Sequence, residues 1–419
     1  MKKILLMAYA VSPTKGSEYS VGWNFITELS KKNIVHLICG ASGEHIGDTK
    51  EIEEYLQKNP IQNLNLHTVK PTNTVDFING FNKKGFGPAF YIAFRFWHKS
   101  ALKKARDIIN EYPIDIIHQY NPIGFREPGY LWKLDKPFVW GPIGGANFVN
   151  PTLLKNKSIR VKVFFLLKNF ATFLQLNFSS RVKKASHKAE RLIFCNTENK
   201  KNFEKFIGKS GLVISEQAVP ILDLNKFDLF LDKDLEDLKI INIGRLNERK
   251  NTKFLLEALS LIQSKKWELH IVGEGNMKNK LIDISIKLEI DKNIVWHGFK
   301  SRKEIFRLIQ QSDLHALTSL SEANTTVLYE TRLFGVPTIS LDQNGMHDTL
   351  ANGNGILVPV TSYDETKKEY AKKIEELIEN REVLEKLKKR TFELAKESTW
   401  SEKVKMYERI YVEILEKKL

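Results

Sequence analysis

Residues 313–337, DLHALTSLSEANTTVLYETRLFGVP, form the stretch that says most about the fold of this chain. The first eight alternate apolar with small polar residues, as a short buried strand does. VLYETRLF then mixes apolar and polar residues as a helix does, and Gly335 and Pro337 are stop signals. The pattern predicts Glu322 in the connecting loop and Glu330 on the first turns of the helix.

Two carboxylates at such a junction can serve one ligand. A phosphate at the helix N-terminus would meet free N–H groups and the positive end of the helix dipole. Glu322 and Glu330 could then accept hydrogen bonds from the hydroxyls of a ribose or a hexose. The spacing favours a sugar-nucleotide site, although two solvated helix glutamates would have the same spacing.

Three strand-like runs precede this stretch, and each ends near glycine. KIINIG at 239–244 is followed by Arg245 and Lys250 and then by a helical segment. ELHIVGEG at 268–275 and NIVWHGF at 293–299 follow in turn. Together with the paired glutamates, this order resembles the C-terminal domain of the retaining family-4 glycosyltransferases of GT-B fold, over about residues 239–360.

The resemblance implies a role for each of these positions. Arg245 and Lys250 would bind the donor pyrophosphate, Glu322 the hydroxyls of the transferred sugar and Glu330 the ribose, and the loop after His297 would hold the base. The donor-binding residues implied are Gly16, Gly244, Arg245, Lys250, Gly273, Gly298, Phe299, Glu322, Asn324, Thr325, Thr326 and Glu330. Those implied in catalysis are Arg245, Lys250, Glu322 and His118.

The segment after Glu322 departs from the family pattern. The family usually has glycines here, where bare backbone amides approach the donor, whereas this chain has Ala323, Asn324, Thr325 and Thr326. We expect side chains to line the pocket at this point, which leaves the donor sugar open.

The N-terminal half also alternates apolar strands with helical segments. Its strands are KILLMAYAV, IVHLICG, LNLHTV, IDIIHQY, FVWGPIGG and RLIFCN. This order predicts a doubly wound parallel sheet, whose ligands bind at the carboxyl ends of the strands. The loops with Gly16, His118 and Gly144–Gly145 would meet there.

A second resemblance rests on P-x-x-G-S-E-x-x-x-G-W at 13–23 and on GPIGG. It is to a branch of the same family found among bacterial cell-surface polysaccharide enzymes. It implies that the Gly16 loop faces the donor phosphates and that His118 lies near the transferred sugar. Members often have His-x-His, but Tyr120 stands at the second position, and a lone strand-end histidine can be structural. Candidates for the acceptor side are Ser17, Glu18, Gly144 and Gly145.

Length and composition predict two domains. A chain of 419 residues with 42% hydrophobic content can bury two cores. The resemblance to GT-B glycosyltransferases implies the fold class, α/β with two Rossmann-like doubly wound domains facing a central cleft. It also implies an acceptor-binding domain at 1–219, a nucleotide-sugar domain at 220–397 and a C-terminal helix at 398–419 that packs back on the first. Cys39 and Cys195 lie in apolar runs, as buried free thiols of a reducing compartment do.

The charge is uneven. Residues 1–220 hold 32 Lys and Arg against 17 Asp and Glu, so the whole net charge of +15 lies in this half. Two segments, 77–106 and 155–189, contain no acid and combine basic with aromatic residues. They predict docking on an anionic membrane surface, where each Lys or Arg contributes about 1 kcal/mol to the binding free energy. No nucleic-acid motif accompanies them, and a solvated basic face is the alternative.

Together with the resemblance, which implies the retaining mechanism and cell-surface polysaccharide synthesis, these observations predict a retaining hexosyltransferase. It would move a sugar from a UDP- or GDP-type donor to a lipid-linked saccharide, in O-antigen or capsule synthesis. No cofactor is expected and no metal ion is required, because fixed positive charge would serve the leaving pyrophosphate. We expect a cytoplasmic protein bound peripherally to the inner face of the cytoplasmic membrane. A GT-B sugar-nucleotide epimerase and a non-catalytic nucleotide-sugar or lipid-binding protein are the alternatives. The base, sugar, linkage, acceptor and oligomeric state stay open.

Overall fold

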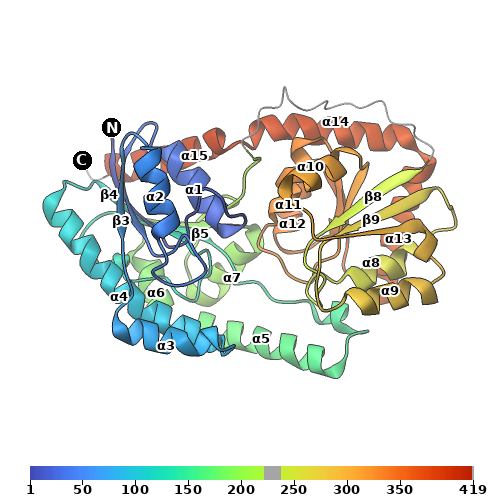
Figure 1. The fold of residues 1–419 in the computed structure, drawn as a ribbon, viewed down its shortest axis with the longest axis horizontal. Helices are drawn as coiled ribbons and strands as arrows, with labels where there is room; N and C mark the ends of the chain where they lie inside the picture. The colour runs from blue at the N-terminus through green and yellow to red at the C-terminus, as the bar shows by residue number, and fades with distance from the viewer. Residues whose placement is uncertain (221–236, 418–419) are drawn as a thin grey trace. The chain divides into compact units, whose positions relative to one another are not determined.

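The computed structural model describes residues 1–220 and 237–417, which form two compact units (Figure 1). The first contains Met1–Ala146, Thr172–Glu216 and Trp400–Leu419, and the second Asn147–Ala171 and Gln217–Thr399. The chain therefore enters the second unit once at 147–171, before it returns to the first, whereas the sequence placed this segment in the N-terminal domain. Residues 221–236, just after the domain boundary expected between 219 and 220, lie outside the described residues.

The first unit is built on a seven-stranded parallel sheet with the order β3-β2-β1-β4-β5-β6-β7. The strands are β1 (Lys3–Ala8), β2 (Ile34–Cys39), β3 (Leu64–Thr68), β4 (Ile116–Asn121), β5 (Phe138–Ile143), β6 (Arg191–Phe194) and β7 (Leu212–Val213). The central strands are buried along their length, as parallel strands covered by helices on both faces are. The strand order reverses between β1 and β4, and loops at such a switch point bind ligands.

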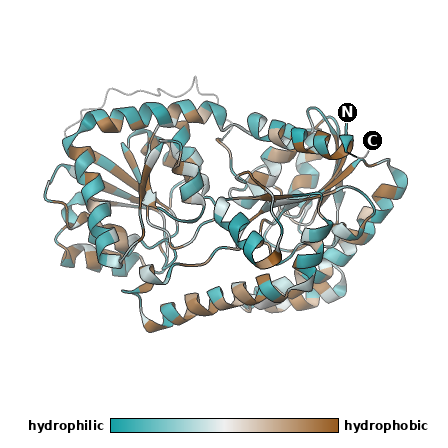
Figure 2. Ribbon diagram, turned by 180° about the vertical axis from the view of Figure 1, so that it is seen from behind, coloured by the Kyte–Doolittle hydropathy of each residue, from teal (hydrophilic) through white to brown (hydrophobic). Residues whose placement is uncertain are grey.

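Helices cover this sheet. They are α1 (Glu18–Leu29), α2 (Lys50–Lys58), α3 (Asn73–Lys83), α4 (Pro88–Glu111), α6 (Ser180–Lys188), α7 (Thr197–Ile207) and α15 (Trp400–Glu416). The C-terminal helix α15 packs on α1, so both ends of the chain belong to this unit. Helix α5 (Ile159–Phe178) carries residues of both units, and Figure 2 shows that much of it is hydrophobic. Many of its apolar side chains are exposed.

The second unit has a six-stranded parallel sheet with the order β10-β9-β8-β11-β12-β13. Its strands are β8 (Leu238–Ile243), β9 (Trp267–Val272), β10 (Ile294–Gly298), β11 (Leu314–Leu317), β12 (Thr338–Leu341) and β13 (Gly355–Val358). Its helices are α8 (Thr252–Leu259), α9 (Lys278–Lys287), α10 (Arg302–Gln310), α11 (Thr326–Leu333), α12 (Asn344–Leu350), α13 (Tyr363–Glu379) and α14 (Arg381–Glu397). The switch point lies between β8 and β11, the two strands that precede Arg245 and Glu322.

Both cysteines are buried free thiols. Among residues 1–220 and 237–417, no helix is both long enough and apolar enough to span a bilayer. Within the same residues, no three His, Cys, Asp or Glu side chains are placed to hold a metal ion together.

Candidate active site

Glu322 lies where the sequence predicted, in the loop between β11 and α11 at the switch point of the second sheet. Its Oε1 atom forms ion pairs with Arg249 Nη1 at 2.5 Å and with Lys250 Nζ at 2.7 Å. Burial opposes ionisation of this carboxyl, but Lys250 and then Arg249 outweigh it and hold the pKa below its ordinary value. The structure thus places a charged carboxylate between two cations.

The cations after β8 have different surroundings, and the predicted contact of Arg245 and Lys250 with pyrophosphate stays a prediction. Lys250 reaches Glu322, whereas Arg245 is exposed and has no ion-pair or hydrogen-bond partner for its side chain among the described residues. Arg249 takes the second position beside Glu322. Sequence reasoning missed Arg249, and the signal that could have found it is its place next to Lys250 in one short loop.

Glycines let the loops of this edge approach one another. A Cβ on Gly273 would lie 2.1 Å from the Gly244 carbonyl oxygen, and one on Gly275 would lie 2.1 Å from that of Leu246. The predicted glycines after β8 and β9 therefore have a packing role, because no side chain fits between the two backbones.

Glu330 lies in α11, as predicted, and only 8% of it is exposed. Its Oε1 atom is 3.3 Å from Nη2 of Arg302, the first residue of α10. Burial raises the pKa of this carboxyl, and the attraction of Arg302 only partly offsets the rise. Phe299, in the loop before α10, is 82% exposed. Sequence reasoning did not single out Arg302.

The segment that replaces the family's glycines is buried. Asn324 and Thr325 are each 8% exposed, and Asn324 Oδ1 accepts a hydrogen bond from Thr349 Oγ1 at 2.9 Å. The Asn324 side chain is therefore held by α12, and the expectation that side chains of this segment line the pocket stays a prediction. Thr325 precedes α11 without a side-chain capping bond, which leaves the first N–H groups of the helix without a cap from this residue.

The loop after β1 carries the predicted residues of the first unit. Ser17 has φ 57°, a left-handed conformation that is strained in a side-chain-bearing residue. Glu18 begins α1, and its Oε1 atom accepts a hydrogen bond from the Ile123 backbone N–H at 2.8 Å. Burial raises the pKa of Glu18. Such a carboxyl could accept a substrate hydroxyl at the carboxyl end of this sheet.

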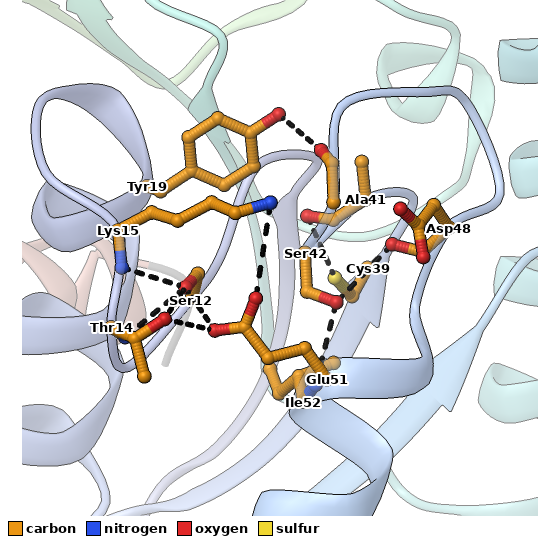
Figure 3. A network of polar contacts seen from close by, with 11 residues as sticks. Ser12, Thr14, Lys15, Tyr19, Cys39, Ala41, Ser42, Asp48, Glu51 and Ile52 are labelled. Carbon is orange, nitrogen blue, oxygen red and sulfur yellow. Dashed lines mark hydrogen bonds and ion pairs between the residues drawn. The ribbon is translucent and has the colours of Figure 1, made fainter.

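A polar network fixes the same loop (Figure 3). Glu51 of α2 accepts hydrogen bonds from Ser12 Oγ at 2.6 Å and Thr14 Oγ1 at 2.5 Å, and its other oxygen lies 3.8 Å from Lys15 Nζ. The Tyr19 hydroxyl donates to the Gly43 carbonyl at 2.6 Å. A Cβ on Gly16 would meet nothing within 4 Å, so the space beside this glycine is open.

The loop after β5 holds the predicted glycine pair. Gly144 pairs with Gly124 in an isolated parallel bridge, and Gly145 has φ 76°. The Arg126 guanidinium donates hydrogen bonds to the Gly145 carbonyl at 3.4 Å and to Thr172 Oγ1 at 2.7 Å. Gly145 therefore takes a backbone conformation that few other residues adopt.

His118 is a core residue of the first unit, and its predicted place near the transferred sugar is wrong. The side chain is fully buried on β4, among the rings of Phe25, Tyr407 and Tyr411. His118 Nε2–H donates a hydrogen bond to the Gly141 carbonyl at 2.7 Å. In this neutral tautomer Nδ1 carries no proton, and it accepts a hydrogen bond from the Tyr411 hydroxyl, also at 2.7 Å. Burial lowers the pKa to about 3, and both ring nitrogens are occupied.

Known sequences resemble part of this chain. Residues 226–394 match a family model described as glycosyl transferases group 1. The putative glycosyltransferase EpsD of Bacillus subtilis is 29% identical over 155 residues, 36% of this chain and 39% of that protein. The lipopolysaccharide 1,6-galactosyltransferase of Salmonella typhimurium is 30% identical over 131 residues, 29% of this chain and 36% of that protein. The chain thus spans about two fifths of the length of such curated relatives.

Solved structures resemble the whole chain. HepE of Anabaena in complex with UDP and glucose has a TM-score of 0.62 at 15% identity, over 99% of this chain and 100% of that one. The lipopolysaccharide outer core galactosyltransferase WaaB has a TM-score of 0.64 at 17% identity, over all of both chains. The chain therefore has the GT-B fold, with two parallel-sheet Rossmann-like domains, and the predicted fold class is confirmed.

Proposed function

We propose that the protein is a retaining glycosyltransferase that moves a hexose from a nucleotide diphosphate sugar to a saccharide. The proposal is carried by the switch point of the second unit. There Glu322 pairs with Arg249 and Lys250 in the loops before α11, and Glu330 lies in α11 itself. Cations, a helix N-terminus and two carboxylates match the phosphates and hydroxyls of a sugar nucleotide. Relatives that are glycosyltransferases, one of them acting in lipopolysaccharide synthesis, support it.

Each group has a part in the transfer. Lys250, the exposed Arg245 and the N–H groups of α11 stabilise the negative charge that develops on the leaving pyrophosphate, which makes a metal ion unnecessary. Glu322 accepts hydrogen bonds from the transferred sugar, and Glu330 from the ribose. The acceptor hydroxyl attacks the face from which the nucleotide leaves, and the departing phosphate takes its proton. The bond between the anomeric carbon and the phosphate oxygen breaks as the new glycosidic bond forms on the same face, and same-face replacement retains the configuration.

The acceptor that we propose is a lipid-linked saccharide of a cell-surface polysaccharide, met at the inner face of the cytoplasmic membrane. Support comes from exposed apolar side chains on α3, α4 and α5 and the turn between α3 and α4. They are Phe77, Phe81, Phe86, Tyr91, Ile92, Phe96, Ile159, Val163, Phe164, Leu166, Leu167, Phe170, Phe173, Leu174 and Phe178. The acid-free segments predicted to dock on a membrane contain all of them.

Two lysines of the second acid-free segment have another role. Lys157 is 4% exposed and pairs with Glu248 at 2.9 Å, and Lys155 pairs with Asp364 at 2.7 Å. Both pairs lie within the second unit, to which Asn147–Ala171 belongs. Apolar side chains of α5 are therefore better suited to test membrane contact than these lysines.

A donor screen tests the proposed function. The purified protein is incubated with UDP- and GDP-sugars, and release of nucleotide and free sugar is followed, with a Lys250→Ala variant as the control. We expect slow hydrolysis of one donor and at least a tenfold loss in the variant, since a charge-assisted contact is worth about 1.5–3 kcal/mol. Interconversion of sugar epimers without transfer would instead identify an epimerase, and no turnover or binding of any donor would refute the proposal.

A further inference from the structure

Arg249 joins the two loops that form the proposed donor site. Its backbone carbonyl accepts from the Leu320 N–H at 2.8 Å, and its Nη1 atom donates to the Ser321 carbonyl at 3.0 Å. The same Nη1 atom lies 2.5 Å from Glu322 Oε1. Three successive residues of the loop after β11 are thus held by one arginine from the loop after β8.

The two cations beside Glu322 contact the same carboxylate oxygen. Lys250 and Arg249 both lie on Oε1, and among the described residues Oε2 has no ion-pair or hydrogen-bond partner. Oε2 is the atom that remains able to accept a hydrogen bond from a sugar hydroxyl. The orientation of the carboxylate therefore depends on how firmly Oε1 is held.

Lys250 is not enough to hold it. In the proposed reaction the Lys250 ammonium also serves the leaving pyrophosphate, and the Glu322 side chain is only 10% exposed. A buried carboxylate that loses its cation is strongly destabilised, so Glu322 needs a second positive charge that phosphate does not claim. Arg249 supplies this charge, and its guanidinium is always protonated.

We infer that Arg249 is a positioning residue for the donor sugar, because it fixes Glu322 with one oxygen turned toward the sugar hydroxyls. The inference rests on the proposed function and adds a residue that acts through Glu322. His315, fully buried on β11, feels the charge of Lys250, and burial and then Lys250 lower its pKa to about 3. His315 is therefore uncharged at the pH of the assays. In the same loop, Glu248 pairs with Lys157 and Arg245 is exposed. Arg249 and Lys250 are therefore the cations that pair with Glu322 among the described residues.

Arg249→Gln removes the positive charge but keeps a hydrogen-bonding side chain, and Arg249→Lys restores the charge. The probe is the UDP- or GDP-sugar that the wild type hydrolyses fastest in the donor screen. For Arg249→Gln we expect the donor KM to rise at least about tenfold, with the Kd of the free nucleotide diphosphate within about twofold of wild type. Arg249→Lys should recover part of the loss. Lys253→Ala, which removes a cation paired with Glu257 on α8, is the matched control and should behave as wild type.

The pH profile separates this role from simple bracing of the loops. Glu322 works as a carboxylate and its pKa is held low, so activity is lost as the pH falls through that pKa. Without Arg249 the pKa rises, and the acid limb of kcat/KM should move to higher pH.

An Arg249→Gln enzyme with wild-type donor KM and acid limb would overturn the inference. A loss that is the same at every pH and is not restored by lysine would also overturn it, in favour of bracing alone. Both results leave the proposed function intact. If the wild type neither binds nor hydrolyses any nucleotide sugar, the proposed function and this inference fall together.

Discussion

Helix α5 offers the sharpest test of membrane contact. Phe164, Leu167 and Phe170 are 62%, 62% and 57% exposed, and their spacing of three residues puts them near one side of the helix. We predict that replacing all three by serine releases the protein from vesicles. The side chains already face solvent, so the change should leave folding almost untouched.

The size of the effect follows from the exposed fractions. Full burial of a Leu or Phe side chain is worth about 1.5–3 kcal/mol, so inserting a side chain that is somewhat more than half exposed gains about 1 kcal/mol. The three together give about 3 kcal/mol, which is roughly a hundredfold change in partitioning.

Co-sedimentation with vesicles of mixed anionic and neutral phospholipid measures this partitioning. The matched control replaces Ile286, Val383 and Met406 by serine, because these apolar residues are 56%, 41% and 47% exposed on other helices. Binding of the wild type should fall as salt screens the anionic surface. Equal binding of the α5 variant and the wild type would refute the assignment of α5 to the membrane.

Three further predictions concern the two units separately. Lys250→Ala should lower donor turnover at least about tenfold at saturating donor, because the leaving pyrophosphate loses a charge-assisted contact; wild-type turnover would contradict the assignment. Glu330→Gln should weaken binding of the free nucleotide diphosphate whereas Glu322→Gln should spare it, and equal losses by calorimetry would contradict the division between ribose and sugar. His118→Ala should lower the free energy of unfolding by about 2–4 kcal/mol through a cavity and a lost bond to Tyr411, with donor hydrolysis per folded molecule unchanged. His118 has a pKa of about 3 in the folded protein and about 6.5 in the unfolded chain. The stability that it contributes should therefore be lost as the pH falls from 6.5 toward 3. Over this pH range, the free energy of unfolding from urea melts should fall more steeply for the wild type than for the His118→Ala variant.

The fold and the positions of Glu322 and Glu330 in the proposed donor site could be predicted from the sequence because their signals are local. Apolar runs that end in glycine mark buried parallel strands, and a strand followed by SEANTTVLYE fixes the places of Glu322 and Glu330 along the chain. Since parallel strands end at one edge of the sheet, residues that follow β8 and β11 must lie close together.

Packing between distant segments decided the rest. The sequence predicted His118 near a strand end, where a ligand-binding histidine can lie, but β4 continues to Asn121. The Tyr411 hydroxyl that hydrogen-bonds the His118 ring comes from α15, almost 300 residues later in the chain. Lys155 and Lys157 belong to a basic segment in sequence, yet they pair with the acids Asp364 and Glu248, which come from distant parts of the same second unit.

Arg249 shows the same limit within a single loop. The sequence determined that Arg245, Arg249 and Lys250 follow one strand, and it determined that a carboxylate follows the neighbouring strand. It did not determine which cation reaches that carboxylate, because this depends on the turn after Gly244 and on the backbone bond from Leu320 to Arg249. Periodicity and spacing place a residue on an element, whereas ion pairing depends on side-chain directions that only the assembled loops define.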